Sequence, residues 1–451
     1  MESIIFKHIL QHFPGIYKKL TVYKSSPVKY RLAYGAFWGA ISVIVPRFVS
    51  LIASFLLARI LGQNQFGEYG MISSTVSMIS TFSGLGLGST VVKHLAEYKI
   101  SDPVRAGRIY TLTTIINWIS AIIYAFAFIL FAPWLAAKTL AAPHLAPLLQ
   151  ISAISMAMGT INSLQQNVFT GLEAFRTSAI ITITTTSIQS IIIVLAAWFW
   201  QLTGVVSALA INSIIIAIIY FYSIKRERKK YNIRIVINEA KYEWPVLIKY
   251  SLPAFLGGIL VGPSFWGANA ILANQPNGYN ELGILNAANQ WQHVIQFIPG
   301  ILGTALLPVM AEKFGNGERL GSIKIMGKMI KIYALIIFPV ATILSLLSTF
   351  IMGGYGESFE SGYITFIITI FTAVLTTLVA PVGQFIAASS KMWVGFIMNF
   401  GWAVCLLTGS YFLGKLGSQG IASAKFIAYF LHAIWVFTYV LLLKRKYERE
   451  Y

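Results

Sequence analysis

The chain has 451 residues, of which 57% are hydrophobic and only 11% are charged, and its formal net charge is +19. A soluble globular domain is about 25% charged, so this composition excludes a water-soluble enzyme and a disordered protein. A nucleic-acid-binding protein would share the basic charge but not the apolar content, so no nucleic-acid partner is expected and the charge is interpreted against a lipid bilayer.

The first 33 residues are basic and contain no long apolar run. They predict a cytoplasmic arm on the membrane surface rather than a cleavable signal peptide. Twelve apolar runs follow, each close to the ~20 residues that a spanning helix needs. The sequence therefore predicts an all-α integral membrane protein with spans at residues 36–61, 69–92, 109–132, 147–170, 178–200, 203–224, 248–273, 283–308, 327–352, 361–387, 392–413 and 419–443.

Basic residues are distributed unevenly between the predicted loops. Most of the 34 lysines and arginines fall on one side of the membrane if both termini are cytoplasmic. This matches the positive-inside rule and favours an even number of spans. The longest polar break divides the chain, so the predicted regions are the arm (1–33), an N-lobe of six helices (34–224), a basic cytoplasmic linker (225–246), a C-lobe of six helices (247–443) and a cytoplasmic tail (444–451).

The second block of helices echoes the first. Residues 66–70 (FGEYG) precede the second predicted span, and residues 279–283 (YNELG) precede the eighth. Because six spans are an even number, both blocks enter the membrane in the same orientation. That arrangement is a parallel repeat, which is common in secondary transporters.

Arg47 follows Pro46 near the middle of the first predicted span. An arginine at this depth is costly and must face a partner or a water-filled cavity. Two interpretations stay open: a structural arginine that caps carbonyls of a neighbouring helix, or a cavity residue that binds an anion. The planar guanidinium suits phosphate because it offers paired donors. Pro46 is a predicted hinge because proline can bend the helix.

Polar side chains recur at helical spacing in two other predicted spans, the eighth and the fourth. Such residues either join helices or line a wet cavity wall suited to sugar hydroxyl groups. Lys425 in the twelfth span either reaches the membrane surface or contributes to the same site. The predicted substrate-binding residues beside Arg47 are therefore Asn286, Asn289, Gln290 and His293 in the eighth span, Asn162 and Gln166 in the fourth, and Lys425.

The remaining chemistry is sparse. Gly84 and Gly86 follow no strand, so they predict close helix packing or a hinge rather than a phosphate-binding loop. The single cysteine, Cys405, excludes a disulfide within the chain. No metal site and no cofactor are predicted. None of the acidic residues falls in the middle of a predicted span, so the interior is cationic and amide-rich, which favours an anionic, hydroxyl-rich cargo over an organic cation.

Several segments together resemble the polysaccharide-biosynthesis (oligosaccharide flippase) family, within the multidrug/oligosaccharidyl-lipid/polysaccharide exporter superfamily. They are residues 55–62 (FLLARILG), 66–69 (FGEY), 84–88 (GLGLG), 92–98 (VKHLAEY), 171–176 (GLEAFR), 286–291 (NAANQW) and 297–300 (FIPG). The resemblance spans most of residues 34–320. It implies two six-helix lobes around a central cavity and places Arg47 where lipid-diphosphate flippases have a cationic residue. The seventh span, in contrast, has no mid-membrane charge.

The resemblance also implies a function. The cargo would be an undecaprenyl-diphosphate-linked glycan, such as an O-antigen repeat unit, moved by alternating access to the outer leaflet of the bacterial inner membrane. Expected partners are this glycan and membrane lipids, with a coupling ion (H⁺ or Na⁺) and a glycan polymerase or ligase as further candidates. Two alternatives remain open: a multidrug antiporter of the same superfamily, and a membrane enzyme of surface-glycan assembly.

Overall fold

A computed structural model describes residues 27–449, apart from 248–250, 252–254, 256–258, 304–305 and 390. The predicted N-terminal arm and the start of the predicted seventh span lie mostly outside the described residues. Every regular element within the described ranges is helical, which confirms the all-α prediction. Seven described helical stretches are long and apolar enough to cross a membrane, and three of them have 47, 55 and 57 residues. Each of those three exceeds twice the ~20 residues of one span. The total of twelve spans stays a prediction.

The first half of the chain forms long antiparallel helices that reverse at two sharp breaks. The first break is at Gly62, whose φ of 69° suits glycine. The second is at Trp200 and Gln201. Both breaks coincide with predicted span ends. The helices are α3 (Pro27–Ser83), α4 (Leu87–Ser101), α5 (Pro103–Trp134), α6 (Ala146–Gly171) and α7 (Phe175–Lys229), with short turns η1 (Leu135–Thr139) and η2 (Pro143–Leu145).

The second half forms a matching group of helices. It follows the short elements α8 (Ile237–Ala240), η3 (Lys241–Glu243) and α9 (Trp244–Val246). Its helices are α11 (Val261–Ala273), α12 (Gly278–Ile295), α13 (Phe297–Gly303), α14 (Leu306–Gly315), α15 (Arg319–Leu346), α16 (Ser348–Tyr355), α17 (Tyr363–Ala388), α18 (Met392–Leu413) and α19 (Gly417–Arg449), with turns η5 (Glu357–Gly362) and η6 (Gly414–Leu416).

Several predicted spans are interrupted at residues that the structure describes. The 69–92 run is broken between α3 and α4, where Leu85 and Gly86 both have positive φ. The 283–308 run is divided at Gln296, between α12 and α13, and the 327–352 run at Leu347, between α15 and α16. Apolar content alone does not reveal these breaks, because a run stays apolar on both sides of a bend.

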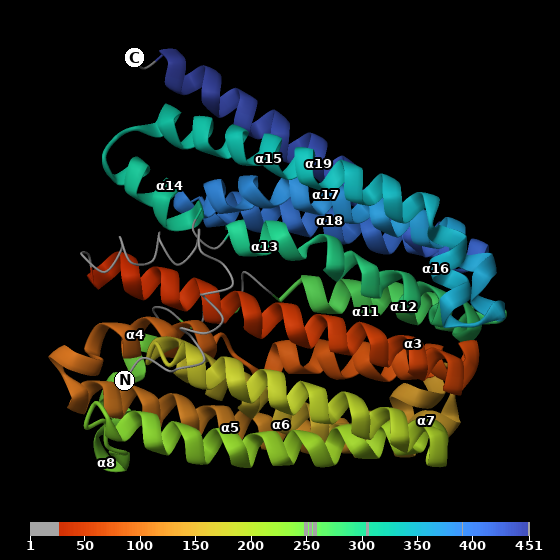
Figure 1. The fold of residues 1–451 in the computed structure, drawn as a ribbon, viewed down its shortest axis with the longest axis horizontal. Helices are drawn as coiled ribbons and strands as arrows, with labels where there is room; N and C mark the ends of the chain where they lie inside the picture. Colours follow the sequence, from red (N-terminus) through yellow and green to blue (C-terminus); the bar gives the residue numbers. More distant parts are fainter. Residues whose placement is uncertain are drawn as a thin grey trace, which may run out of the picture.

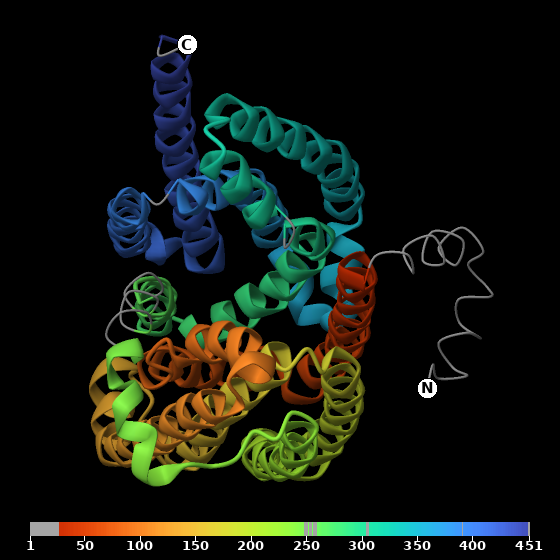
Figure 2. The same cartoon turned by 90° about the vertical axis from the view of Figure 1, so that its left-hand side faces the viewer.

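The helices gather into two bundles, as Figure 1 shows. We call α3–α7 the N-lobe and α11–α19 the C-lobe, which agrees with the two-lobe fold that was expected. Seen from the end, the bundles lie side by side and meet along α3, α11 and α12 (Figure 2). Figure 1 also places α4, α8 and the C-terminus at one end of the molecule and α16 at the other. We call these the linker end and the Gly62 end.

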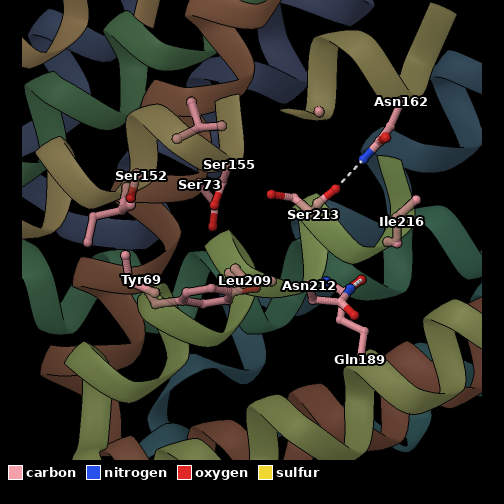
Figure 3. A pocket seen from close by; sticks show the side chains of 14 residues that line it. Tyr69, Ser73, Ser152, Ser155, Asn162, Gln189, Leu209, Asn212, Ser213 and Ile216 are labelled. Carbon is pink, nitrogen blue, oxygen red and sulfur yellow. Dashed lines mark hydrogen bonds between the residues drawn. The ribbon is translucent and has the colours of Figure 1, made fainter. Parts of the chain in front are cut away.

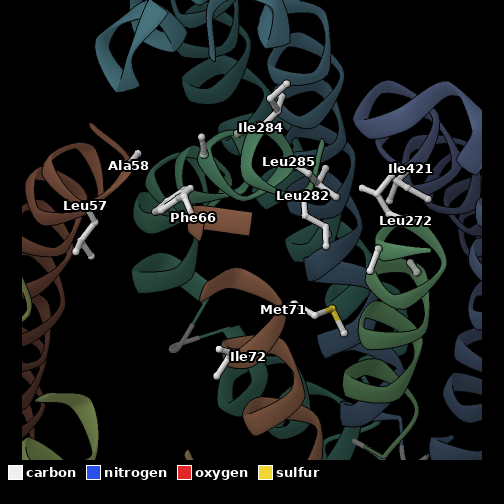
Figure 4. Close-up of a cluster of buried hydrophobic side chains, with 14 of the residues drawn as sticks. Leu57, Ala58, Phe66, Met71, Ile72, Leu272, Leu282, Ile284, Leu285 and Ile421 are labelled. Carbon is white, nitrogen blue, oxygen red and sulfur yellow. The ribbon is translucent and has the colours of Figure 1, made fainter. Parts of the chain in front are cut away.

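The seam between the lobes is apolar. Side chains from α3, among them Phe66 and Met71, face Leu282 and Leu285 from α12 (Figure 4). Met71 is fully buried there. Burial of this kind stabilises a contact by about 25 cal/mol per Å² of apolar surface, so the lobes are joined by packing and not only by the chain.

Glycines let the two backbones touch at this seam. A Cβ atom at Gly67 would lie 1.8 Å from the carbonyl oxygen of Tyr279, and one at Gly283 would lie 2.3 Å from that of Gln63. Real Cβ atoms do not approach an oxygen so closely, so only glycine fits at either position. Gly67 lies in the first of the repeated segments (66–70) and Gly283 in the second (279–283), at different positions of the repeat. Each segment therefore supplies one glycine to this close contact.

Side chains close the Gly62 end by bonding carbonyl groups of the other lobe. Arg59 Nε donates to Gly354 O at 2.7 Å, and the hydroxyl of Tyr279 donates to Leu140 O at 2.8 Å. Gln63 Nε2 similarly donates to the carbonyl of Ser358. These bonds tie the ends of both lobes together on this side of the molecule.

The linker is fixed to the N-lobe at the other end. Helix α7 continues to Lys229, so the first residues of the predicted linker are helical, and we use the name linker for residues 230–246. Glu243, whose side chain is 8% exposed, accepts from both Arg105 and Arg108 of α5 at 3.3 Å. Arg108 also donates to Glu239 at 3.1 Å, and this bond raises the pKa of Arg108. The linker therefore packs as part of the N-lobe.

We expect Glu243→Gln to destabilise the protein by about 1–2 kcal/mol, because a buried carboxylate that serves two arginines makes charge-assisted hydrogen bonds. Thermal unfolding in detergent measures this. The matched control is Glu239→Gln, since the side chain of Glu239 is half exposed and such pairs contribute about 0–1 kcal/mol. Equal effects of the two variants would contradict the conclusion that Glu243 fixes the linker to the N-lobe.

Candidate functional site

Arg47 lies in α3 one residue after Pro46, and it reaches across to the C-lobe. Its Nη1 atom donates to the carbonyl oxygen of His293 at 2.5 Å. Helix α12 ends at Ile295, so this carbonyl is in the last turn and lacks a partner within the helix. The capping contact anticipated from the sequence is therefore present. The side chain is nevertheless exposed, and the guanidinium has five N–H donors, so most of them remain available to an anion.

Lys425 of α19 approaches the same helix from the C-lobe. Its Nζ atom donates to Gln292 Oε1 at 2.6 Å and to Asn289 Oδ1 at 3.1 Å, and it lies 5.1 Å from the centre of the Phe265 ring. The residue is 9% exposed, so the interpretation that it reaches the membrane surface is wrong. Within the described part of the chain, neither Lys425 nor Arg47 has a carboxylate partner.

The polar residues predicted in the eighth span lie along α12 as a polar stripe, where they contact several different neighbours instead of lining one cavity wall. Asn286 packs against Gly70 of α3, where its Nδ2 atom occupies the space that a side chain would need. Asn289 binds Lys425, whereas His293 is exposed and offers its carbonyl to Arg47. Gln290 is half buried on the same helix. The stripe thus holds the two cations and the lobe seam together.

Asn162 of α6 lies in a different place. It lines a cavity of about 340 Å³ inside the N-lobe, between α3, α6 and α7, and its Nδ2 atom donates to Ser213 O at 2.9 Å (Figure 3). Gln166 is exposed on the same helix and does not line this cavity. The predicted site is therefore divided: the cations and α12 form one group, and Asn162 belongs to another.

The predicted hinge residues occupy two kinds of structure. Pro46 is buried inside a helix that continues without a break. Gly84 and Gly86 lie in the turn between α3 and α4, where Gly86 has a φ of 68° and a Cβ atom would lie 2.4 Å from Ser251 O. Only glycine suits that position. Movement about any of the three stays a prediction.

Metal ligands do not gather anywhere in the part of the chain that the structure describes. No group of three or more His, Cys, Asp or Glu side chains there could hold an ion. The arrangement of Arg47, Lys425 and neutral amides is suited to binding an anion, because both cations have only uncharged partners.

Residues 32–314 match the family model described as "Polysaccharide biosynthesis protein". The chain belongs to this family. The match covers more than half of the chain and includes Arg47, the lobe seam and all of α12, so the family resemblance inferred from the sequence is confirmed.

Two curated proteins are similar in sequence to this polysaccharide biosynthesis protein, and both are named EPS I polysaccharide export inner membrane protein EpsE. The one from Ralstonia nicotianae is 25% identical over 184 residues, which are 39% of this chain and 41% of the relative. The one from Ralstonia solanacearum is 27% identical over 180 residues, or 39% and 40%. The aligned part thus spans about two fifths of these relatives.

Solved structures share the fold. An inward-facing MATE family multidrug resistance transporter of the MOP superfamily has a TM-score of 0.74 at 13% identity, with 90% of this chain and 98% of that one covered. The lipid II flippase MurJ in an inward closed conformation has 0.68 at 16% identity, with 89% and 86% covered. At these identities the likeness establishes that this chain has the same two-lobe fold. Those proteins are a transporter and a flippase, not enzymes.

Sequence reasoning missed Gln292, which makes the shortest bond to Lys425. Gln292 lies three residues after Asn289, so helical spacing could have placed it beside the chosen stripe. It also missed the cavity residues Tyr69, Gln189 and Asn212. They come from three separate helices or half-helices, and their meeting depends on how the N-lobe packs.

Proposed function

We propose that this family member flips a lipid-diphosphate-linked oligosaccharide from the cytoplasmic to the outer leaflet by alternating access. The observation that carries the proposal is a pair of cations that contact α12 from other helices: Arg47 of α3, exposed and bound to one carbonyl, and Lys425 of α19, buried with only amide partners. A diphosphate supplies the negative charge that both lack. The family match, the export role in the relatives' names and the fold shared with a lipid II flippase support the same class.

The proposed orientation puts the linker end in the cytoplasm of a bacterial inner membrane, with both termini inside. The basic residues of α4, the linker and the end of α19 support it through the positive-inside rule. The glycan head would enter between the lobes from that side, while the prenyl tail stays in lipid. The bonds of Arg59, Gln63 and Tyr279 at the Gly62 end would break when the site opens outward.

The proposed cargo is undecaprenyl-diphosphate glycan, such as an O-antigen-type repeat unit. Outward movement of a diphosphate is favoured by a negative interior by about 2.3 kcal/mol per charge per 100 mV. Membrane potential therefore provides a driving force, with proton or sodium antiport as a second source. A glycan polymerase or ligase in the outer leaflet would consume the flipped lipid.

The alternative function left open by the sequence is a multidrug antiporter that exports organic cations, and a multidrug resistance transporter shares the fold. A cation substrate would require an anionic wall, whereas the described wall carries Arg47 and Lys425. The two functions therefore demand opposite charges at the same place.

Deletion of the gene separates these functions. We expect surface glycan to disappear and prenyl-linked repeat units to accumulate in the inner leaflet, where a membrane-impermeant glycosidase added to intact cells cannot cleave them. Cleavable units at the outer face would instead indicate a lost polymerase or ligase. Drug sensitivity without a glycan defect would indicate the cation exporter, and either result would overturn the proposal.

A further inference from the structure

The cavity inside the N-lobe has no role in the function proposed so far. It has a volume of about 340 Å³ and is bounded by the second half of α3, by α6 and by both halves of α7. The side chains that face it in Figure 3 include Tyr69, Ser155, Asn162, Gln189 and Asn212. All five are polar and none carries a charge at neutral pH. The rest of the lining combines Gly159 and the hydroxyl groups of three serines with apolar side chains, which are Ile72, Val76, Val206, Leu209 and Ile216.

The cavity is not sealed by protein atoms. Ser155, Asn162 and Gln189 are each half buried, and Gly159 on the wall is exposed. Half-exposed amides within a membrane-spanning bundle must face water, because contact with hydrocarbon would leave their polar atoms unpaired at a high cost. The N-lobe cavity is therefore wet and accepts polar groups.

Some hydrogen-bonding atoms on the wall lack partners. Asn162 donates to Ser213 and Asn212 donates to Gln189 Oε1 at 3.0 Å, so the amide network is partly satisfied. Asn162 Oδ1 and Ser155 Oγ, however, are buried atoms without a hydrogen-bond partner among the described residues. Buried polar atoms of this kind are normally paired, so a ligand with hydroxyl or amide donors would satisfy them.

The chemistry of the wall selects the ligand. Neutral amides and hydroxyl groups bind groups that both donate and accept hydrogen bonds, and the Tyr69 ring adds an apolar face. A phosphate would find no cation here, and an apolar chain would leave the amides unpaired. A sugar ring has hydroxyl groups at its edge and apolar C–H faces, which matches this wall.

We infer that the N-lobe cavity is a subsite for a neutral sugar of the transported glycan, separate from the two cations, Arg47 and Lys425, that contact α12. This inference rests on the proposed function. Helix α3 links the two places, since Arg47 is in its first half and Tyr69 in its second. Neighbouring packed helices are about 8–10 Å apart, so a diphosphate held by Arg47 leaves the attached glycan close to the N-lobe.

Gly159 provides a way to fill the cavity without disturbing the fold, because a Cβ atom there would meet nothing within 4 Å. The test uses the full chain in vesicles with two probes, a prenyl diphosphate carrying one N-acetylhexosamine and the bare prenyl diphosphate. The wild type should bind the sugar-bearing lipid about tenfold more tightly, as expected for one or two net hydrogen bonds. Gly159→Leu should bind both lipids equally and leave affinity for the bare lipid unchanged.

The matched control is Gly383→Leu in α17, where a Cβ atom also meets nothing within 4 Å, and it should keep the tenfold preference. Arg47→Ala should weaken binding of both lipids. An undiminished sugar preference in Gly159→Leu would overturn the subsite and leave the proposed function standing. Failure of the wild type to bind either lipid would overturn the proposed function and, with it, the subsite.

Discussion

Surface glycan should disappear when Arg47 is replaced by alanine, while the amount of protein in the membrane stays close to that of the wild type. The guanidinium is exposed and uses one donor for His293 O. If the others bind a diphosphate, two charge-assisted hydrogen bonds at about 1.5–3 kcal/mol each are lost, which corresponds to at least about 100-fold in affinity. Immunodetection of surface glycan and immunoblotting of membranes measure the two quantities.

The capping role of Arg47 needs its own control. Arg47→Gln keeps an N–H donor for His293 O but removes the charge, whereas Arg47→Lys keeps the charge and loses the planar fork. We expect glutamine to be as inactive as alanine and lysine to retain partial export. Lys138→Ala, which removes an exposed cation outside α3, should export normally. Full export by Arg47→Gln would show that the residue only caps α12.

A second large effect is expected at the lobe seam. Gly67→Val places a side chain where even a Cβ atom would lie 1.8 Å from Tyr279 O. The lobes could no longer meet at the Gly62 end, so export should be lost because the closed state cannot form. Loss of this contact should also expose the buried cluster around Met71.

Thiol labelling measures that opening. Cys405 is the single cysteine, so a Cys405→Ser, Met71→Cys protein has one thiol at the seam. A membrane-impermeant maleimide should label it when Gly67→Val is present and leave it unlabelled otherwise. Gly353→Val, at a glycine whose surroundings are empty within 4 Å, is the control and should change neither labelling nor export. Normal export by Gly67→Val would contradict a seam that must close.

The fold follows from short-range properties of the sequence to a large extent. Apolar runs located most helices, and the breaks at Gly62 and Gln201 lie at predicted span ends. The bends after Ser83 and at Gln296 were not predicted, because they depend on tertiary contacts. Gly86, for example, must take a positive φ where the Ser251 carbonyl lies against it.

The site was predicted less completely, because its contacts join residues that are far apart along the sequence. Depth in the membrane identified Arg47 and Lys425 as unusual cations. Their partners are 246 and 133 positions away along the chain, and a single sequence contains no signal for such distances. Helical spacing also placed Asn162 with the α12 stripe because both are polar. Packing separates them, since Asn162 lines the N-lobe cavity whereas the α12 stripe contacts Arg47 and Lys425.

Attachment of the linker to the N-lobe restricts how the two lobes can move relative to each other. If the segment between the two lobes were flexible, each lobe could move without constraining the other. Here Glu243 bonds to Arg105 and Arg108, so residues 230–246 move together with the N-lobe. The part of the chain that can extend between the lobes is then much shorter than the whole segment between α7 and α11. Its length limits how far the lobes can separate at the linker end.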